Sequence, residues 1–385
     1  MLKKRSSIIL YAVVTLALCI LFINVAVWVV NLNDYHNSDF FTFWLSGRFA
    51  LDGQDPYQSE NWIGGHHLYG ATWIPNATLV YPLPFSIFFI PFGLIPLYEA
   101  FVIWVGLSQA MILISILLLF RLYPNGIAKQ YAFPLIAGII LFRPTIITLI
   151  NGQLSGLFLL LLVMIIIFWE RGKWWEGSIF IPLLALKPNL GVPIIVLLFF
   201  YLVVKRKKSS IIVIFAGGLF LVLVGMILDP NWIVHYWSAG STKMAQTFGY
   251  APSIWGLGRW MCDGKTSCIA ILGSSMSMLL LLLFGSLILV KGNATTPKYV
   301  VGLTIVLMLF LTPHTWPYDQ ILLVIPIFII TLGLANSNAK FLPTALIFLF
   351  LDVAALIILK INAYLQNEIW CVTLTAIVFF LLLRY

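Results

Sequence analysis

The chain has 385 residues, of which 62% are hydrophobic and only 9% are charged. A soluble domain usually carries about 25% charged residues, so this composition excludes an ordinary soluble protein. The formal net charge of +9 does not indicate a nucleic acid partner, because most Lys and Arg residues fall in short loops between apolar runs. Runs of about 18 or more apolar residues recur along the chain, and each can cross a bilayer as a helix. We therefore expect an all-α, polytopic integral membrane bundle that forms a single domain over residues 1–385.

The first apolar run covers residues 8–30 and follows Lys3, Lys4 and Arg5. It is about twice as long as the apolar part of a signal peptide, and no clear small-residue cleavage site follows it. We interpret it as a retained first helix with its N-terminus in the cytoplasm.

The stretch HNSDFFTFWLSGRFALDGQDPY, residues 36–57, opens a first outer loop that we place at residues 31–97. Asn37, Ser38 and Asp39 before an apolar run are an ordinary helix start, and Gly53 is a suitable helix end. A carboxylate at the membrane surface can also act as a general base. Spacing alone leaves both interpretations of Asp39 open.

The same loop ends in YPLPFSIFFIPFGLIP, residues 81–96, with prolines at positions 82, 84, 91 and 96. So many prolines make a straight spanning helix unfavourable. We predict a re-entrant or interfacial segment at the outer face.

The positions of the cations indicate how the chain crosses the membrane. About twelve transmembrane helices fit the apolar runs, at residues 8–30, 98–121, 131–150, 154–169, 174–188, 190–204, 210–228, 269–290, 299–312, 320–334, 341–359 and 369–383. This arrangement puts fifteen Lys and Arg on the cytoplasmic side and six outside, namely Arg48, Lys187, Lys243, Arg259, Lys265 and Lys360. If residues 82–97 crossed and residues 177–204 were one helix, the counts would be eleven and ten. The positive-inside rule favours the first arrangement, with both termini cytoplasmic.

In this arrangement the unusual polar residues gather at the outer face, under the first outer loop and a second one at residues 229–268. Arg143 lies eight residues before Asn151, about 12 Å below the outer boundary. Arg143 and Lys187 either extend to lipid headgroups or bind a lipid phosphate. His314 lies near Asp319 in the turn TPHTWPYDQ. It can be interpreted as a phosphate ligand, as a proton carrier or as a structural residue.

The sequence contains few features of metal or nucleotide sites. Four Asp residues of the first outer loop lack the EF-hand pattern, and the chain has no DxD motif and no GxxxxGK[ST] loop. We expect no cofactor and no metal. Cys262 and Cys268 flank the turn DGKTS and could form a disulfide if that loop faces outside.

Five motifs in a fixed order resemble a known family. These are SDFFTFWLSGRFALDGQDPY, YPLPFSIFFIPFGLIP, NGQ at 151–153, LLALKPN and TPHTWPYDQ. Together they resemble the polyprenol-phosphate-mannose-dependent mannosyltransferases, which include the phosphatidylinositol mannoside α-1,2-mannosyltransferases of the GT-C superfamily. The chain departs from the family pattern at Leu83, where the second Pro of YPP is expected, and at Asp319-Gln320, where relatives often have a His.

The resemblance implies a GT-C-like bundle and an inverting transfer of a sugar, with mannose favoured, at the outer face of the cell membrane. The donor would be a polyprenyl-phosphate sugar, and the acceptor a lipid-linked or free glycan in contact with membrane lipids. Asp39 would be the catalytic base. The candidates for binding the donor phosphate are Arg143, Lys187 and His314, with Arg259 in reserve. The candidates for binding substrate are Tyr81, Asn151, Gln153, Asn189, Trp316, Asp319, Arg48 and His66, although loop surface is the simpler interpretation of His66 and structural support that of Arg48.

Two other functions fit a polytopic chain. A flippase or transporter of lipid-linked oligosaccharides would have internal repeats and broken helices near the midplane, and we find no convincing repeat. A polymerase of cell-surface glycans would carry a longer outer loop with several Arg residues, whereas residues 229–268 contain Lys243, Arg259 and Lys265 only.

Overall fold

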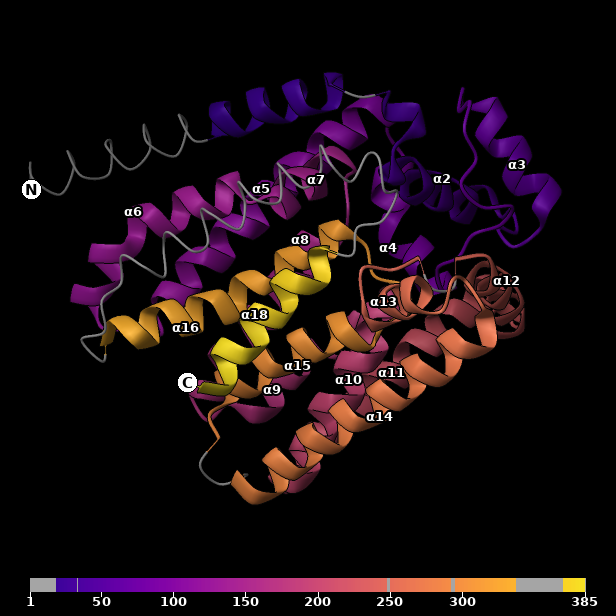
Figure 1. Ribbon diagram of the computed structural model, residues 1–385. Helices are drawn as coiled ribbons and strands as arrows, with labels where there is room; N and C mark the ends of the chain where they lie inside the picture. Colours follow the sequence, from indigo (N-terminus) through magenta and orange to yellow (C-terminus); the bar gives the residue numbers. More distant parts are fainter. Residues whose placement is uncertain (1–18, 33, 248–249, 292–294, 337–369, 385) are drawn as a thin grey trace, which may run out of the picture.

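The computed structural model describes residues 19–32, 34–247, 250–291, 295–336 and 370–384, and every regular element within them is helical (Figure 1). The helix expected at residues 341–359 and the start of the helix expected at residues 8–30 lie outside the described residues. The expectation of an all-α bundle is confirmed for the part of the chain that the structure describes.

Three described helices are long and apolar enough to cross a membrane: α5 (Leu97–Phe120), α11 (Lys208–Leu228) and α14 (Thr266–Lys291). Helices α6 (Asn125–Leu141) and α7 (Arg143–Ile150) meet at an angle of 50°, and together they have the length and composition of one broken span or of a re-entrant loop. Phe142 lies between them in extended geometry, and Pro144 follows at the start of α7, where a proline is well tolerated. The chain is a membrane protein, and the count of twelve spans stays a prediction.

Shorter apolar helices fill the rest of the bundle. They are Cys19–Asn31, α8 (Ser155–Glu170), α9 (Trp174–Ser178), η2 (Pro182–Leu186), α10 (Pro188–Val204), α15 (Pro297–Leu311), η3 (Pro317–Leu323), α16 (Val324–Asn336) and α18 (Trp370–Arg384). Most agree to within a few residues with the expected ranges where these are described. The single helix expected at residues 174–188 is instead the short helix α9, a turn and the 3-10 helix η2. Most residues of α8 and α15 are buried, so these two helices lie at the centre of the bundle. Around them pack α5 against α8, and α10, α16 and α18 against α15.

A group of short helices lies at one end of the bundle (Figure 1). They come from the two expected outer loops and are α2 (Asp39–Asp52), α3 (Ser59–Leu68), α4 (Leu83–Gly93), α12 (Trp232–Thr247) and α13 (Ile254–Met261). Helix α4 has 11 residues with Pro91 inside it. At 1.5 Å per residue it is about 16 Å long, which is too short to cross a bilayer core of about 30 Å. This length agrees with the expectation that the segment does not cross by itself.

Helices α2 and α4 pack against each other with their backbones in close contact. A methyl group on Gly47 of α2 would overlap the carbonyl oxygen of Phe89 of α4. The Arg48 guanidinium donates to Gly93 O at 3.0 Å, and the Trp44 indole N–H donates to Ile95 O at 2.9 Å. These contacts make α2 and α4 one unit, so Arg48 serves as the structural support that the sequence suggested.

The turn between α13 and α14 is closed by a disulfide between Cys262 and Cys268. Helix α13 is attached in turn to the end of α15, since the Trp255 indole N–H donates to Leu311 O at 2.7 Å. The disulfide therefore lies at the end of the bundle where the short helices gather.

Candidate active site

Asp39 is the first residue of α2, where a carboxylate is favoured by the positive end of the helix dipole. Ser38 caps the helix through its hydroxyl, which accepts from Phe41 N at 3.3 Å. The backbone N–H of Phe40 leaves the local helix pattern and donates to Asn151 O at 3.1 Å. The start of α2 is thereby attached to the NGQ turn between α7 and α8.

Gly152 makes this attachment possible. Its φ of +63° lies in the left-handed region that favours glycine, and a side chain there would overlap Phe40 and Phe101. The carbonyl oxygen of Gly152 accepts from the Trp104 indole N–H at 2.7 Å. The turn is therefore held from both sides and places Gln153 beside Asp39.

Gln153 connects Asp39 to Lys187. Its side-chain nitrogen donates to Asp39 Oδ2 at 2.5 Å, and its side-chain oxygen accepts from Lys187 Nζ at 3.2 Å. The Gln153 side chain is buried and Asp39 is half-buried. Because the lysine can only donate and the carboxylate can only accept, the two partners fix the orientation of the amide.

Lys187 also forms a buried ion pair with Asp319. Nζ lies 2.8 Å from Asp319 Oδ1, and the two side chains are 2% and 0% exposed. Asp319 further accepts from the Ser155 hydroxyl at 2.8 Å and from Trp316 N at 2.9 Å. A buried ion pair requires such additional hydrogen bonds to offset the loss of hydration. Four segments that are distant in the sequence are thus joined in one polar network.

A cavity of about 510 Å³ lies against this network. Lys187, Asn189, His314, Trp316 and Tyr81 were predicted from the sequence and line it; Asp39 is connected to it through Gln153 and Lys187 rather than lining it. Asn189 donates to His314 O at 2.5 Å, which ties the LLALKPN segment to the TPHTWPYDQ turn.

Burial raises the pKa of the Tyr81 hydroxyl well above its ordinary value, and the negative charge of Asp39 raises it further. Tyr81 therefore stays neutral beside Asp39 and can donate a hydrogen bond to a ligand in the cavity.

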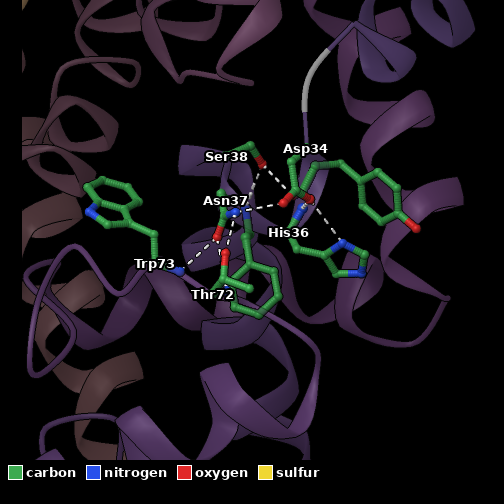
Figure 2. Close-up of polar contacts among 8 residues, drawn as sticks. Asp34, His36, Asn37, Ser38, Thr72 and Trp73 are labelled. Atoms are coloured by element: carbon green, nitrogen blue, oxygen red, sulfur yellow. Dashed lines mark hydrogen bonds and ion pairs between the residues drawn. The ribbon is translucent and has the colours of Figure 1, made fainter.

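A cluster around Asn37 holds the loop before α4 across the start of α2 (Figure 2). The Asn37 side-chain nitrogen donates to Asp34 Oδ2 at 2.6 Å and to the Thr72 hydroxyl at 2.9 Å. Its oxygen accepts from the backbone N–H groups of Thr72 and Trp73, at 3.1 and 2.9 Å. Both ends of the amide are used. The loop that leads to Tyr81 is therefore bonded to Asn37, which lies two residues before Asp39 in the chain.

The other predicted phosphate ligands lie elsewhere. Arg143 begins α7 at the bend between α6 and α7, and it is absent from the lining of the cavity. Arg259 stacks on Tyr250, with its guanidinium carbon 3.9 Å from the ring centre and a hydrogen bond of 2.8 Å to the hydroxyl. Neither residue joins Lys187 at the cavity.

His66 is a packed residue of α3, neither a lining residue of the cavity nor part of the loop surface. Its ring lies 5.1 Å from that of Phe41 and 5.0 Å from that of Trp62, and Nδ1 lies 2.8 Å from Trp62 O. Burial lowers the pKa of His66. The loop-surface interpretation of this residue is wrong, because apolar neighbours on both sides enclose the ring.

Several residues at the site were not foreseen. Ser155 completes the hydrogen bonding of Asp319, and its place directly after NGQL was the available signal. Tyr318 lines the cavity with its ring centre 4.7 Å from Lys187 Nζ, and Tyr236 and Trp237 of α12 also line it. Among the described residues, no group of three or more His, Cys, Asp and Glu side chains could hold a metal ion.

A membrane helical bundle with a carboxylate, a buried lysine and a largely apolar cavity at one end has the features of a membrane-embedded enzyme. The model of glycosyltransferase family 87 matches residues 79–316, and the chain belongs to this family. It is therefore a membrane glycosyltransferase. The comparisons with curated proteins and with solved structures found no match.

Proposed function

We propose that the chain transfers a hexose, with mannose as the first candidate, from a polyprenyl-phosphate donor to a lipid-linked or free glycan acceptor. The observation that carries the proposal is the Gln153 bridge, which joins a half-buried carboxylate to a lysine at the wall of a largely apolar cavity. Membership of a glycosyltransferase family supports the reaction class.

The cavity suits a donor with an apolar tail and an anionic head. Most of its lining is apolar, and Lys187 contributes a cation. Lys187 Nζ has three N–H groups, of which Asp319 and Gln153 each accept one. The third N–H group can form a hydrogen bond to the phosphate of the sugar donor. This hydrogen bond becomes stronger as the phosphate gains negative charge on leaving.

Asp39 acts as the general base. Its carboxylate takes the proton of the acceptor hydroxyl while that oxygen forms a bond to the anomeric carbon. The bond between the anomeric carbon and the phosphate oxygen breaks, and the phosphate leaves with the electron pair. Attack from the face opposite the leaving group inverts a β-linked donor to an α-linked product.

The disulfide supports an outer-face site, because disulfides persist in oxidising compartments. A cysteine at the exposed position Leu68 should react from outside with an impermeant reagent, whereas one at the exposed position Lys173 should not. The background would carry Cys19→Ser and Cys371→Ser, so that only the introduced thiol is free. If the reagent labelled Lys173→Cys and not Leu68→Cys, the chain would have the opposite orientation to the one proposed.

The reaction is tested with purified protein, a polyprenyl-phosphate mannose donor and a membrane extract as acceptor source, with products identified by mass spectrometry. Asp39→Asn keeps the size of the side chain and should lower turnover by at least about 100-fold, since it removes a general base. Asp52→Asn is the matched control, because Asp52 ends the same helix and is exposed. Equal turnover in the two variants would refute Asp39 as the base.

A further inference from the structure

A second cavity lies next to the first, and it has a different chemical character. Its volume is about 380 Å³, and Val80 and helix α12 contribute to the walls of both cavities. Tyr57 lines the second cavity and donates its hydroxyl to the backbone oxygen of Tyr81, which lines the first, at 2.7 Å. The two cavities therefore adjoin along the segment from residue 78 to residue 81.

The lining of the second cavity has a larger polar share than that of the first, and it contains neither Lys nor Arg in the part of the chain that the structure describes. Asp55, Gln58, Asn76, Thr78 and His235 provide side-chain donors and acceptors. The first cavity has Lys187 and suits an anion, whereas carboxylate and amide oxygens suit hydroxyl donors. The first cavity thus suits an anionic ligand, and the second suits a ligand that carries hydroxyl groups.

Two lining residues have acceptor capacity that the described protein groups leave unused. The side-chain oxygen of Asn76 is buried, and within the described ranges it has no hydrogen-bond partner. Asp55 uses Oδ1 to accept from Tyr57 N at 2.9 Å, and Oδ2 has no partner among the described residues. Unmade hydrogen bonds of buried polar groups are unfavourable, so a ligand hydroxyl gains from meeting them.

The aromatic residues of the second cavity are held in place from outside it. His235 lies with Nδ1 2.8 Å from Asp229 Oδ2, and its ring centre lies 6.3 Å from that of Tyr57. Tyr57 is fixed by the bond from its hydroxyl to Tyr81 O. Two fixed rings beside several acceptors form a small preorganised site, and its volume is at the low end of the range of about 300–1,000 Å³ for small-molecule sites.

We propose that the second cavity binds a neutral polyhydroxylated ring, a hexose or a cyclitol, which is the part of the acceptor that receives the sugar. The inference rests on the proposed function, because a glycosyl transfer needs an acceptor site that adjoins the donor site. Because the two cavities adjoin at Val80, they place the two ligands next to each other, at the end of the bundle that carries Asp39.

Binding is measured without donor, on the purified full-length protein in detergent, by saturation-transfer-difference NMR. The probes are methyl α-mannopyranoside and myo-inositol, with mannose 6-phosphate as the anionic comparison. Asn76→Leu removes the unpartnered oxygen, and Ala77→Trp fills the cavity from an exposed position that does not threaten the fold. Asn24→Leu is the matched control, because Asn24 is an exposed asparagine that donates to Ile20 O and lines neither cavity.

The expected result is that a neutral probe binds to the wild type and to Asn24→Leu, with a Kd at least about tenfold higher in Asn76→Leu and in Ala77→Trp. Polyprenyl phosphate should bind equally to all four proteins, since it occupies the other cavity. Equal binding of the neutral probes to Ala77→Trp and the wild type would overturn the proposal, as would tighter binding of mannose 6-phosphate. Neutral probes that bind as expected, in a protein that transfers sugar from no polyprenyl-phosphate donor, would refute the proposed donor and leave the site supported.

Discussion

Gln153 donates a hydrogen bond of 2.5 Å to the carboxylate of Asp39, from a position 114 residues further along the chain. The same amide accepts from Lys187, which lines the larger cavity. A residue expected to contact substrate is thus placed between the proposed base and the proposed phosphate ligand. Its role in the proposed reaction is to position Asp39.

Replacing Gln153 by Leu should therefore reduce kcat more than it changes the KM for the donor. The carboxylate of Asp39 would lose its fixed orientation, and a displacement of about 1 Å at a reacting group can cost about 100-fold in rate. Steady-state kinetics with varied donor measures both parameters. Gln109→Leu is the control, because Gln109 is a partly buried glutamine of α5 bonded to Phe22 O. A rise in the KM for the donor with an unchanged kcat would instead indicate that Gln153 binds substrate.

The Lys187–Asp319 pair should contribute to stability only as a pair. Asp319→Ala leaves a buried ammonium without its partner, and such changes cost about 3–5 kcal/mol. The double variant Lys187→Met with Asp319→Leu removes both charges and should recover most of that loss while remaining inactive. Thermal unfolding in detergent and turnover are measured on the same samples. An active double variant would exclude Lys187 as a phosphate ligand.

Gly152→Ala should destabilise the protein and displace the NGQ turn. The residue has a φ of +63°, which costs an alanine about 1–2 kcal/mol, and its methyl group would overlap Phe40 and Phe101. Gly106→Ala is the matched control, because a methyl group there meets nothing within 4 Å and alanine favours helix. The melting temperature should fall in the first variant and stay equal or rise in the second. A similar effect of the two changes would contradict the packing described at Gly152.

His66 should make the fold sensitive to acid. Burial lowers the pKa of His66 below its ordinary 6.5, so the unfolded chain takes up a proton more readily than the folded one. The contribution is fully present above pH 6.5 and is lost as the pH falls toward the lowered pKa. The melting temperature of the wild type should fall more between about pH 7.5 and about pH 5 than that of His66→Phe.

His67→Gln serves as the control for this pH dependence, since His67 is exposed on the same helix. It should retain the acid sensitivity of the wild type. If His66→Phe retained it too, another group would be responsible.

Much of the bundle could be predicted from the sequence because lipid leaves few choices. Long apolar runs must be helices, and prolines at positions 82, 84, 91 and 96 correctly indicated that α4 is short. The short helices of the outer loops contain no long apolar run, so the sequence gives little indication of them. α12 and α13 lie in a region that the sequence presented only as a loop.

The site was predictable as a set of motifs and not as a network. Lys187, Asn189, His314 and Trp316 were expected together and do line one cavity. Arg143 and Arg259 carry the same charge as Lys187 but lie away from this cavity. The sequence could not distinguish the three residues, because charge says nothing about which face of a helix a residue occupies. The burial of Asp319 and His66 depends on packing between distant segments, which a single sequence does not encode in any local pattern.

The segment along which the two cavities adjoin, residues 78–81, is held in place by several hydrogen bonds. The Asn37 cluster holds its approach at Thr72 and Trp73, Leu79 N donates to Pro56 O at 2.9 Å, and the Tyr57 hydroxyl holds its end. Helix α12 contributes to the lining of both cavities, and its Trp237 is 75% exposed. A change in the position of this one helix would therefore alter the two cavities together.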